Sequence, residues 1–432
     1  MDEFEIEDGL LIKYRGNDAS VIIPDGVIEI QDFAFYNNER LTSVKMPQSV
    51  VKICDSAFYG CENLKNVQFS QNLEEIADDA FGNCKSIESL MLPPLLKTIG
   101  YSAFYGCAIS ELVIPDSVEE IGDEAFSFCE NLERVAVGKN VSEMGGAPFG
   151  YCEKLKKIEI HPQNENFVFK SGCLINAEEK TLLQTLEEFE IPADGSVTEF
   201  GEGAFAGHDS LRNFEVPEFI AKIHNGRAFA DCHNLRRLTV ARGNRHYYSH
   251  NDCIIEKSSG RLVFGLNPEN IPDTDSVKTI GMGAFPETSG ATRITLPRGV
   301  EEISEFVFCN FTDLRSVTLP DSLKTICDNA FTGCKNLETV NLGNGLKTIG
   351  QWAFSECTSL KEIEFPESLE KIGAYAFENV PLEKAIFRAP KNWIAYAWKK
   401  APCKPKFKKP KIAAEILAAH KIETYFERKA EK

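Results

Sequence analysis

Apolar residues recur along this chain with a period of about 23 residues, and each period centres on a phenylalanine that follows a small or apolar residue, usually alanine. A fixed period of this size predicts a solenoid of stacked coils, because a single coil cannot bury its apolar face alone. Most of the steps between neighbouring phenylalanines of this set keep close to that period. These residues are Phe35, Phe58, Phe81, Phe104, Phe126, Phe149, Phe205, Phe229, Phe285, Phe308, Phe331, Phe354 and Phe377.

Within one unit, the apolar positions predict two short strands joined by a turn. Residues 321–342 read DSLKTICDNAFTGCKNLETVNL, a spacing too irregular for one amphipathic helix and too sparse for one strand. We expect one strand at the Leu-x-x-Val-x-Leu pattern, a second at Leu-x-x-Ile, and the Ala-Phe turn between them. Stacking then places equivalent strands about 4.8 Å apart in parallel sheets and each phenylalanine on the next one.

Two segments interrupt the period and match each other at a constant offset along the chain. The steps from Phe149 to Phe205 and from Phe229 to Phe285 are equal in length, and each is more than twice the usual step. The matching pairs indicate that one coil and one insert were duplicated together. The inserts, 161–192 and 241–272, read as β-hairpins that either project and bind a partner or act as packed spacers. The pairs are Asn164 with Asn244, Cys173 with Cys253, Ile175 with Ile255, Leu182 with Leu262, and Pro192 with Pro272.

The two ends of the array are expected to cap it, because solenoid ends expose core and sheet edge. Residues 1–24 predict a capping hairpin built from residues 8–14 and 21–24, ahead of a solenoid of about 13 coils over 25–387. Residues 388–432 predict a C-terminal cap, a basic linker and a helix. In that segment we expect a short amphipathic helix over 392–400 with Trp393 toward the core, an extended Pro- and Lys-rich stretch over 401–411, and a helix over 412–427.

The repeat unit resembles the BspA-like leucine-rich repeat family, whose units read roughly Val-x-x-Ile-Gly-x-x-Ala-Phe-x-x-Cys-x-x-Leu-x-x-Val-x-Ile-Pro. The match is nearly verbatim at 117–137 and 322–342 and extends over most of 21–387. The resemblance implies a mainly β leucine-rich repeat solenoid, with a parallel sheet on the concave face and short turns and strands on the convex face. It also implies a binding or adhesion surface without catalysis. Many relatives are exported, whereas this chain begins with the acidic Met1-Asp2-Glu3-Phe4-Glu5.

Charge is distributed unevenly along the chain. The formal net charge is −18, yet residues 388–432 contain 13 Lys and Arg against 4 Glu. An acidic body disfavours nucleic acid, whereas the basic tail could contact an anionic partner. No apolar run reaches the length of a membrane span. We therefore predict a cytoplasmic protein, with the cell surface or secretion as the alternative if a signal had been removed.

Eight of the 14 cysteines share one phase of the repeat, three residues after the phenylalanine. A residue fixed to the repeat phase packs in every coil, which favours a ladder of buried thiols over disulfides. The best metal-ligand cluster, His246 with His250 and Cys253, lies in an extended segment that separates the imidazoles by about 13 Å. We therefore expect no metal site. The eight cysteines are Cys61, Cys84, Cys107, Cys129, Cys152, Cys232, Cys334 and Cys357.

The repeated acid pairs, such as Glu119–Glu120, exchange with Lys-Thr at the same phase and predict a solvated outer surface. No phosphate-binding loop, nucleophile elbow or HExxH motif occurs in the sequence. We therefore predict neither an enzyme nor a cofactor.

The candidate binding residues are exposed cations on the Leu-x-x-Val-x-Leu strands of the middle coils, together with two tyrosines of the second insert. A basic stripe on an acidic body could seat an acidic ligand, and the alternative is a mixed solvated face. We predict a monomeric, non-catalytic protein–protein interaction scaffold that binds through the concave face and the inserts. Two alternatives stay open: a cell-surface adhesin or host-interaction protein, and a regulator that binds an anionic partner such as nucleic acid through 399–411. The candidate residues are Arg134, Lys157, Arg237, Arg293, Tyr247 and Tyr248.

Overall fold

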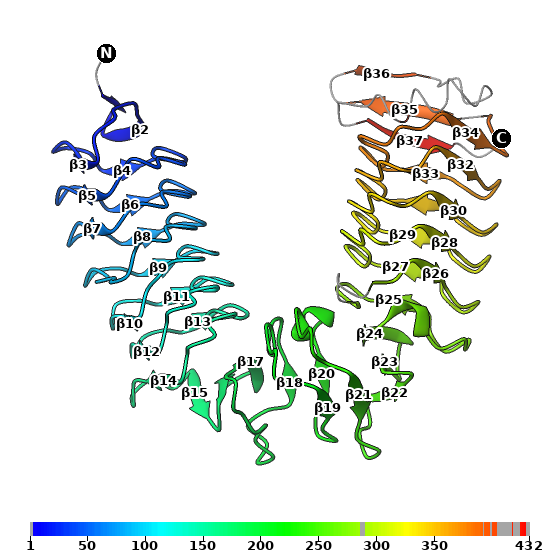
Figure 1. Cartoon of the computed structure of the whole chain (residues 1–432), viewed down its shortest axis with the longest axis horizontal. Helices are drawn as coiled ribbons and strands as arrows, with labels where there is room; N and C mark the ends of the chain where they lie inside the picture. The colour runs from blue at the N-terminus through cyan, green and yellow to red at the C-terminus, as the bar shows by residue number, and fades with distance from the viewer. Residues whose placement is uncertain are drawn as a thin grey trace. The chain divides into compact units, whose positions relative to one another are not determined.

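The computed structural model describes residues 3–285, 290–391, 393–397, 400–403, 417 and 424–428. It consists of two compact units, unit 1 (Met1–Ser210) and unit 2 (Leu211–Lys432), each a stack of β-coils (Figure 1). Within the described ranges, the helical residues are two short 3₁₀ segments, η1 (Gly226–Phe229) and η2 (Pro268–Asn270), and Leu417. The predicted fold, a mainly β leucine-rich repeat solenoid, is confirmed.

Most coils of unit 1 contribute one long and one short strand, as the two sequence patterns predict. Alternate residues of a long strand point inward and outward, so the central Leu112 of one strand is buried while its neighbours are exposed. The long strands form the parallel sheets β3-β5-β7 and β10-β12-β14. The short strands from β4 to β13 form one ladder with β1 and β2, whereas β18 belongs to a different sheet. The long strands are β3 (Ser20–Ile22), β5 (Ser43–Lys45), β7 (Asn66–Gln68), β10 (Glu111–Val113), β12 (Arg134–Val137) and β14 (Lys157–Ile160). The short strands are β4 (Glu29–Ile30), β6 (Lys52–Ile53), β8 (Glu75–Ile76), β9 (Thr98–Ile99), β11 (Glu120–Ile121), β13 (Glu143–Met144) and β18 (Glu199–Phe200).

Unit 2 repeats the same arrangement. Its long strands form the parallel sheets β19-β21, β26-β28-β30 and β32-β34. They are β19 (Asn213–Val216), β21 (Arg237–Val240), β26 (Arg293–Thr295), β28 (Ser316–Thr318), β30 (Thr339–Asn341), β32 (Glu362–Phe365) and β34 (Lys384–Phe387). The short strands are β20 (Lys222–Ile223), β25 (Thr279–Ile280), β27 (Glu302–Ile303), β29 (Thr325–Ile326), β31 (Thr348–Ile349) and β33 (Lys371–Ile372).

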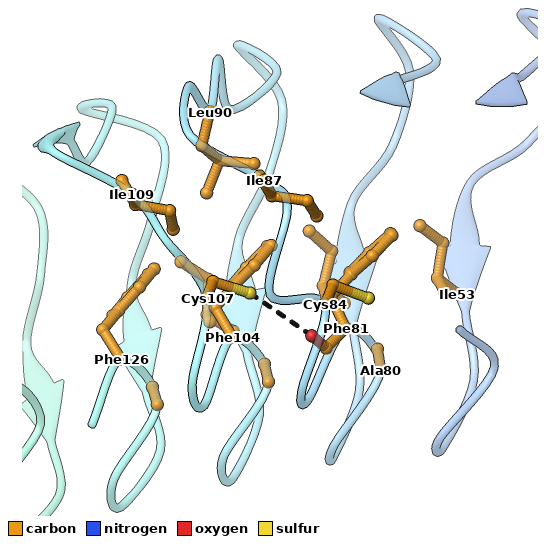
Figure 2. Packing of buried hydrophobic residues seen from close by; sticks show 14 of the residues in the cluster. Ile53, Ala80, Phe81, Cys84, Ile87, Leu90, Phe104, Cys107, Ile109 and Phe126 are labelled. Atoms are coloured by element: carbon orange, nitrogen blue, oxygen red, sulfur yellow. Dashed lines mark hydrogen bonds between the residues drawn. The ribbon is translucent and has the colours of Figure 1, made fainter. Parts of the chain in front are cut away.

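The repeated phenylalanines form the predicted aromatic ladder in the core of each unit. Figure 2 shows the part of it in unit 1 that contains Phe81, Phe104 and Phe126. In unit 1, Phe58 and Phe81 stack with ring centroids 4.9 Å apart, and Phe81 and Phe104 follow at 5.4 Å. In unit 2, Phe331 and Phe354 stack at 5.2 Å. The ring spacing follows the strand spacing, because each phenylalanine occupies the same position in successive coils.

The phase-locked cysteines are packing residues, as predicted. The Cys84 thiol donates a hydrogen bond to the Phe58 carbonyl oxygen at 3.2 Å, and the Cys107 thiol donates to that of Phe81 at 3.4 Å (Figure 2). Burial raises the pKa of both thiols. Every cysteine whose side chain the structure describes is a free thiol. The same hydrogen bond recurs at Cys61, Cys129, Cys152, Cys334 and Cys357.

The two inserts add turns to the solenoid. Each contains an antiparallel hairpin whose second strand pairs with a third, and the third strand pairs in parallel with the next short strand, β17 with β18 and β24 with β25. All five residues of β17 are buried. The inserts are therefore packed into the stack, and with the N-terminal β2 they bring the predicted 13 coils to about 16 turns. Their strands are β15 (Phe167–Lys170), β16 (Cys173–Asn176), β17 (Thr181–Thr185), β22 (Tyr247–His250), β23 (Cys253–Glu256) and β24 (Arg261–Gly265).

The N-terminal hairpin forms from different partners than the sequence predicts. β2 (Leu10–Tyr14) pairs antiparallel with β1 (Phe4–Glu7), and parallel with β4 on its other side. The segment expected to complete the hairpin is β3, which joins the long-strand sheet beside β5. Tyr14 extends the aromatic ladder, with its ring 5.1 Å from that of Phe35. Its phenol fills the phenylalanine position, so β2 continues the stack.

The helix predicted over 392–400 is wrong, because Trp393–Ala397 forms the strand β35. β35 pairs with β37 (Thr424–Arg428), β37 pairs with β33, and β36 (Lys400–Cys403) pairs with β35. These strands cover the last short strand, whose edge a helix would leave unpaired. Trp393 is buried with its ring 5.4 Å from Phe387, as predicted.

The second predicted helix, over 412–427, is wrong at its end, where β37 forms. Thr424, Tyr425 and Phe426 have the β-branched or aromatic side chains that favour a strand. The remainder of that segment lies outside the described residues, apart from Leu417. The basic linker over 404–411 lies outside them as well.

Candidate binding surfaces

A buried asparagine fixes the start of each insert to the coil before it. The Asn164 amide donates to the carbonyl oxygens of Gly138 and Val141 at 3.0 Å each, while its Oδ1 accepts from the amides of Asn166 and Phe167. Asn244 makes the equivalent four hydrogen bonds in the second insert. An asparagine provides both donors and acceptors, which explains why this residue occurs at the same point of both duplicated blocks.

The second insert also caps the backbone of the preceding coil with three side-chain oxygens. The Tyr247 hydroxyl accepts from the Ile223 amide at 2.8 Å. Asp252 Oδ1 accepts from Leu238 at 3.1 Å, and Ser249 Oγ accepts from Val240 at 3.0 Å, both on β21. The first insert has Phe167, Gly172 and Phe169 at these three positions, and none of their side chains contains an oxygen.

The two candidate tyrosines have different environments. Tyr247 is only 1% exposed, so the sequence-based assignment of Tyr247 to a partner surface is wrong. Its ring is buried, and its hydroxyl accepts a hydrogen bond from the backbone of β20. Tyr248 is half-buried, and its hydroxyl lies 2.9 Å from Ser276 Oγ.

In unit 1 the candidate cations are neighbours, and both lie beside one acid. Arg134 and Lys157 are paired positions of β12 and β14, and both side chains are exposed. The Glu159 carboxylate lies 3.6 Å from the Arg134 guanidinium and forms an ion pair with Lys157. The hydrogen bond from Lys157 lowers the pKa of Glu159. The structure therefore brings these two predicted residues together around a shared carboxylate, which offsets one of their two positive charges.

In unit 2 the candidate cations lie on separate sheets. Arg237 belongs to the sheet β19-β21 and Arg293 to β26-β28-β30. Thr239 occupies the position equivalent to Glu159. Neither arginine forms an ion pair with a described residue, and both are exposed.

A hollow of about 390 Å³ lies beside Arg237, between β21 and the turn of the second insert. Asp252 and Ser249, whose oxygens cap β21, form part of its wall. The sequence singled out Arg237 but gave no sign of the hollow, which depends on the capping contacts. The hollow is lined by Arg236, Arg237, Leu238, Thr239, Ser249, His250, Asn251 and Asp252.

Two exposed apolar residues occupy equivalent positions in successive coils of unit 1. We define the long-strand face as the outward side of the long strands, together with the equivalent positions of the coil that has none. Met91 is 85% exposed and Val113, one coil later, is 66% exposed. The coil of Met91 has no long strand, and the sheet divides there into β3-β5-β7 and β10-β12-β14. Neither residue is among the candidates selected from the sequence. The signal was an apolar residue at a phase that is polar in most other coils.

The model of the BspA type leucine-rich repeat region matches the chain in six copies, over residues 13–112, 51–174, 97–236, 175–254 and 278–400. Together these ranges cover most of the chain. The chain belongs to the BspA-type leucine-rich repeat family. The resemblance seen in the sequence is thereby confirmed. A comparison with curated proteins gives no match to this BspA-type chain.

Solved structures similar to this BspA-type solenoid include three bacterial leucine-rich repeat proteins. The T. pallidum leucine-rich repeat protein is 33% identical over 35% of this chain and 73% of its own, with a TM-score of 0.34. A leucine-rich cell surface protein from Faecalibacterium prausnitzii is 25% identical over 87% of this chain and 83% of its own, with a TM-score of 0.38. A leucine-rich repeat protein from Eubacterium ventriosum is 18% identical over 87% and 89%, with a TM-score of 0.41.

No group of three or more His, Cys, Asp or Glu side chains among the described residues could hold a metal ion. No helix in the same residues is long and apolar enough to cross a membrane.

Proposed function

We propose that this chain is a non-catalytic protein-interaction scaffold whose partner contacts the long-strand face. The observation that carries the proposal is the exposed pair Met91 and Val113, an apolar centre on a face that is otherwise largely polar. Exposed apolar residues with a polar surround have the composition of a protein interface. Membership of a repeat family whose coils present extended surfaces supports the same proposal.

The exposed cations belong to the proposed contact surface. Arg134 lies one coil after Val113, at the position paired with Glu111, and Lys157 follows it on β14. Arg237 and Arg293 supply the corresponding charges in unit 2. Such charges at the rim of an interface select the partner and speed association more than they add affinity.

The test is affinity capture with the full chain carrying Met91→Asp and Val113→Asp together. Ile22→Asp is the matched control, because Ile22 is a 69% exposed apolar residue of the same face, several coils away. We expect proteins retained by the wild type and the Ile22→Asp variant to be lost from the double variant. If the double variant retains the same proteins, the Met91–Val113 pair is not the contact.

The compartment in which this scaffold works is a separate part of the proposal. The cytoplasm remains our expectation from the sequence, and surface display is the alternative that fits a family with exported relatives. Fractionation of the native cells with an antibody to the chain decides between the two. Proteolysis of intact cells that removes the antigen would overturn the cytoplasmic assignment.

A further inference from the structure

Each duplicated block consists of one coil and the insert that follows it. Compared with the first block, the second has fewer acidic side chains but retains basic ones on one part of its surface. In the first block, Lys157 pairs with Glu159, and Lys170 pairs with Asp194. At the equivalent positions of the second block the acids are replaced by Thr239 and Thr274, whereas the bases are replaced by Arg237 and His250. Residues 236–252 contain four arginines and one aspartate, against three lysines and two glutamates in 156–172.

These unpaired groups converge on the hollow beside β21. Arg236, Arg237 and His250 line it, and all three are exposed. The Arg236 guanidinium donates to the His233 carbonyl oxygen at 3.1 Å, which positions its planar group. Asp252 is already engaged, because its Oδ1 accepts the Leu238 amide. Since Asp252 and Ser249 cap β21, the hollow presents side-chain groups and not a free strand edge.

We propose that this hollow binds an acidic segment of a partner protein, with Arg236 and Arg237 receiving its carboxylates. The proposal rests on the function proposed above, because it takes the partner to be a protein. It adds a second binding site, beside β21, and the acidic character of the segment that binds there. Arginine matches a carboxylate with two parallel hydrogen bonds. The volume, about 390 Å³, is in the range of small binding sites. A long polyanion is disfavoured, because the chain as a whole has a net charge of −18.

The test measures binding of a fluorescein-labelled tetra-glutamate peptide to the full chain by anisotropy at low salt, with a tetra-glutamine peptide as control. We expect Arg237→Glu to weaken binding by about tenfold or more. Thr239→Glu restores the acid of the first block and is expected to weaken binding with Arg237 intact. Lys157→Glu is the matched control, because it makes the same charge reversal at the equivalent strand position, and we expect a change of less than about twofold. All three positions lie on the surface, and circular dichroism confirms that the variants fold.

Equal losses from Arg237→Glu and Lys157→Glu would show a general charge effect and overturn the proposal, as would tetra-glutamine binding as tightly as tetra-glutamate. A single-stranded thymidine oligonucleotide that binds more tightly than the peptide, in an Arg237-dependent manner, would replace the acidic segment with nucleic acid and overturn it as well. These failures are distinct from failure of the scaffold, which the Met91 and Val113 variants test in unit 1.

Discussion

The two inserts occupy equivalent places in their blocks, yet they complete the preceding coil by opposite chemistry. In the first insert, Gln184 lies in the core, where its Oε1 accepts from the Phe149 amide at 2.9 Å and its Nε2 donates to the Phe149 carbonyl at 2.7 Å. Its counterpart Phe264 stacks on Phe229 with ring centroids 5.1 Å apart and continues the aromatic ladder. The second insert instead places its polar side chains at the strand edges. A repeat array therefore accepts an extra turn whenever the backbone groups it covers find partners, whichever residues provide them.

Gln184→Leu is expected to produce the largest effect of the changes that break this comparison. It leaves the Phe149 amide and carbonyl buried without a partner, so unit 1 should lose about 3 kcal/mol of unfolding free energy. Phe264→Leu is the control in the second insert and should cost about 1 kcal/mol, since it reduces packing without orphaning a polar group. Urea unfolding measures both. Equal losses would mean that Gln184 acts only as a space-filling residue.

Tyr247→Phe should cause the next largest loss of stability. It removes one hydrogen bond to the backbone, whereas Gln184→Leu removes two. The Ile223 amide then stays buried without a partner, which costs about 1 to 2 kcal/mol in unit 2. Tyr248→Phe is the control, since that hydroxyl lies 2.9 Å from Oγ of the exposed Ser276. We expect its loss to stay below about 0.5 kcal/mol. A Tyr248→Phe variant as unstable as Tyr247→Phe would contradict the capping role.

The first insert contains a pH-sensitive contact that the second lacks. His208 is buried at the cysteine phase of its coil, with Nε2 2.8 Å from Thr185 Oγ1 on β17 and Nδ1 3.8 Å from the Glu187 carboxylate. The position equivalent to Thr185 in the second insert is Gly265. Burial lowers the pKa of His208, with the Thr185 and Glu187 contacts opposing the shift.

Unit 1 should therefore lose stability as the pH falls. Below the ordinary histidine pKa of about 6.5, the unfolded chain binds a proton that the folded chain excludes. The loss is at most about 1.4 kcal/mol for each pH unit and stops once the folded imidazole itself takes up a proton. His208→Cys, which restores the usual residue of this phase, should flatten the dependence between pH 7.5 and 5.5 in urea unfolding. If the wild type and the variant show the same slope, other groups control it.

The sequence predicts the regular coils well, because one phase explains every copy. The phenylalanine ladder, the buried thiols of Cys84 and Cys107, and the two strand patterns all follow from it. The sequence-based prediction was wrong where pairing with the unpaired edge of a sheet decides the local structure. Trp393–Ala397 forms a strand because β33 offers an unpaired edge, and helical spacing in the sequence contains no information about that edge. Tyr247 was misplaced for a related reason, since its partner is a backbone amide in another coil.

The smallest expected effect is on peptide binding by the first block. It tests whether charge alone explains why the second block binds an acidic segment and the first does not. Glu159→Thr gives the first block the residue of the second and frees Arg134 and Lys157 from their shared counter-ion. If exposed cations were sufficient, the variant would gain a second tetra-glutamate site as strong as the first. We expect only about a twofold gain in binding, because exposed pairs contribute little and the hollow beside β21 is built by Asp252 and Ser249, which the first insert lacks. Titration of the peptide into Glu159→Thr and into Glu159→Thr with Arg237→Glu separates the two sites. Strong binding that survives Arg237→Glu would show that the local charge, and not the shape of the hollow, makes the site.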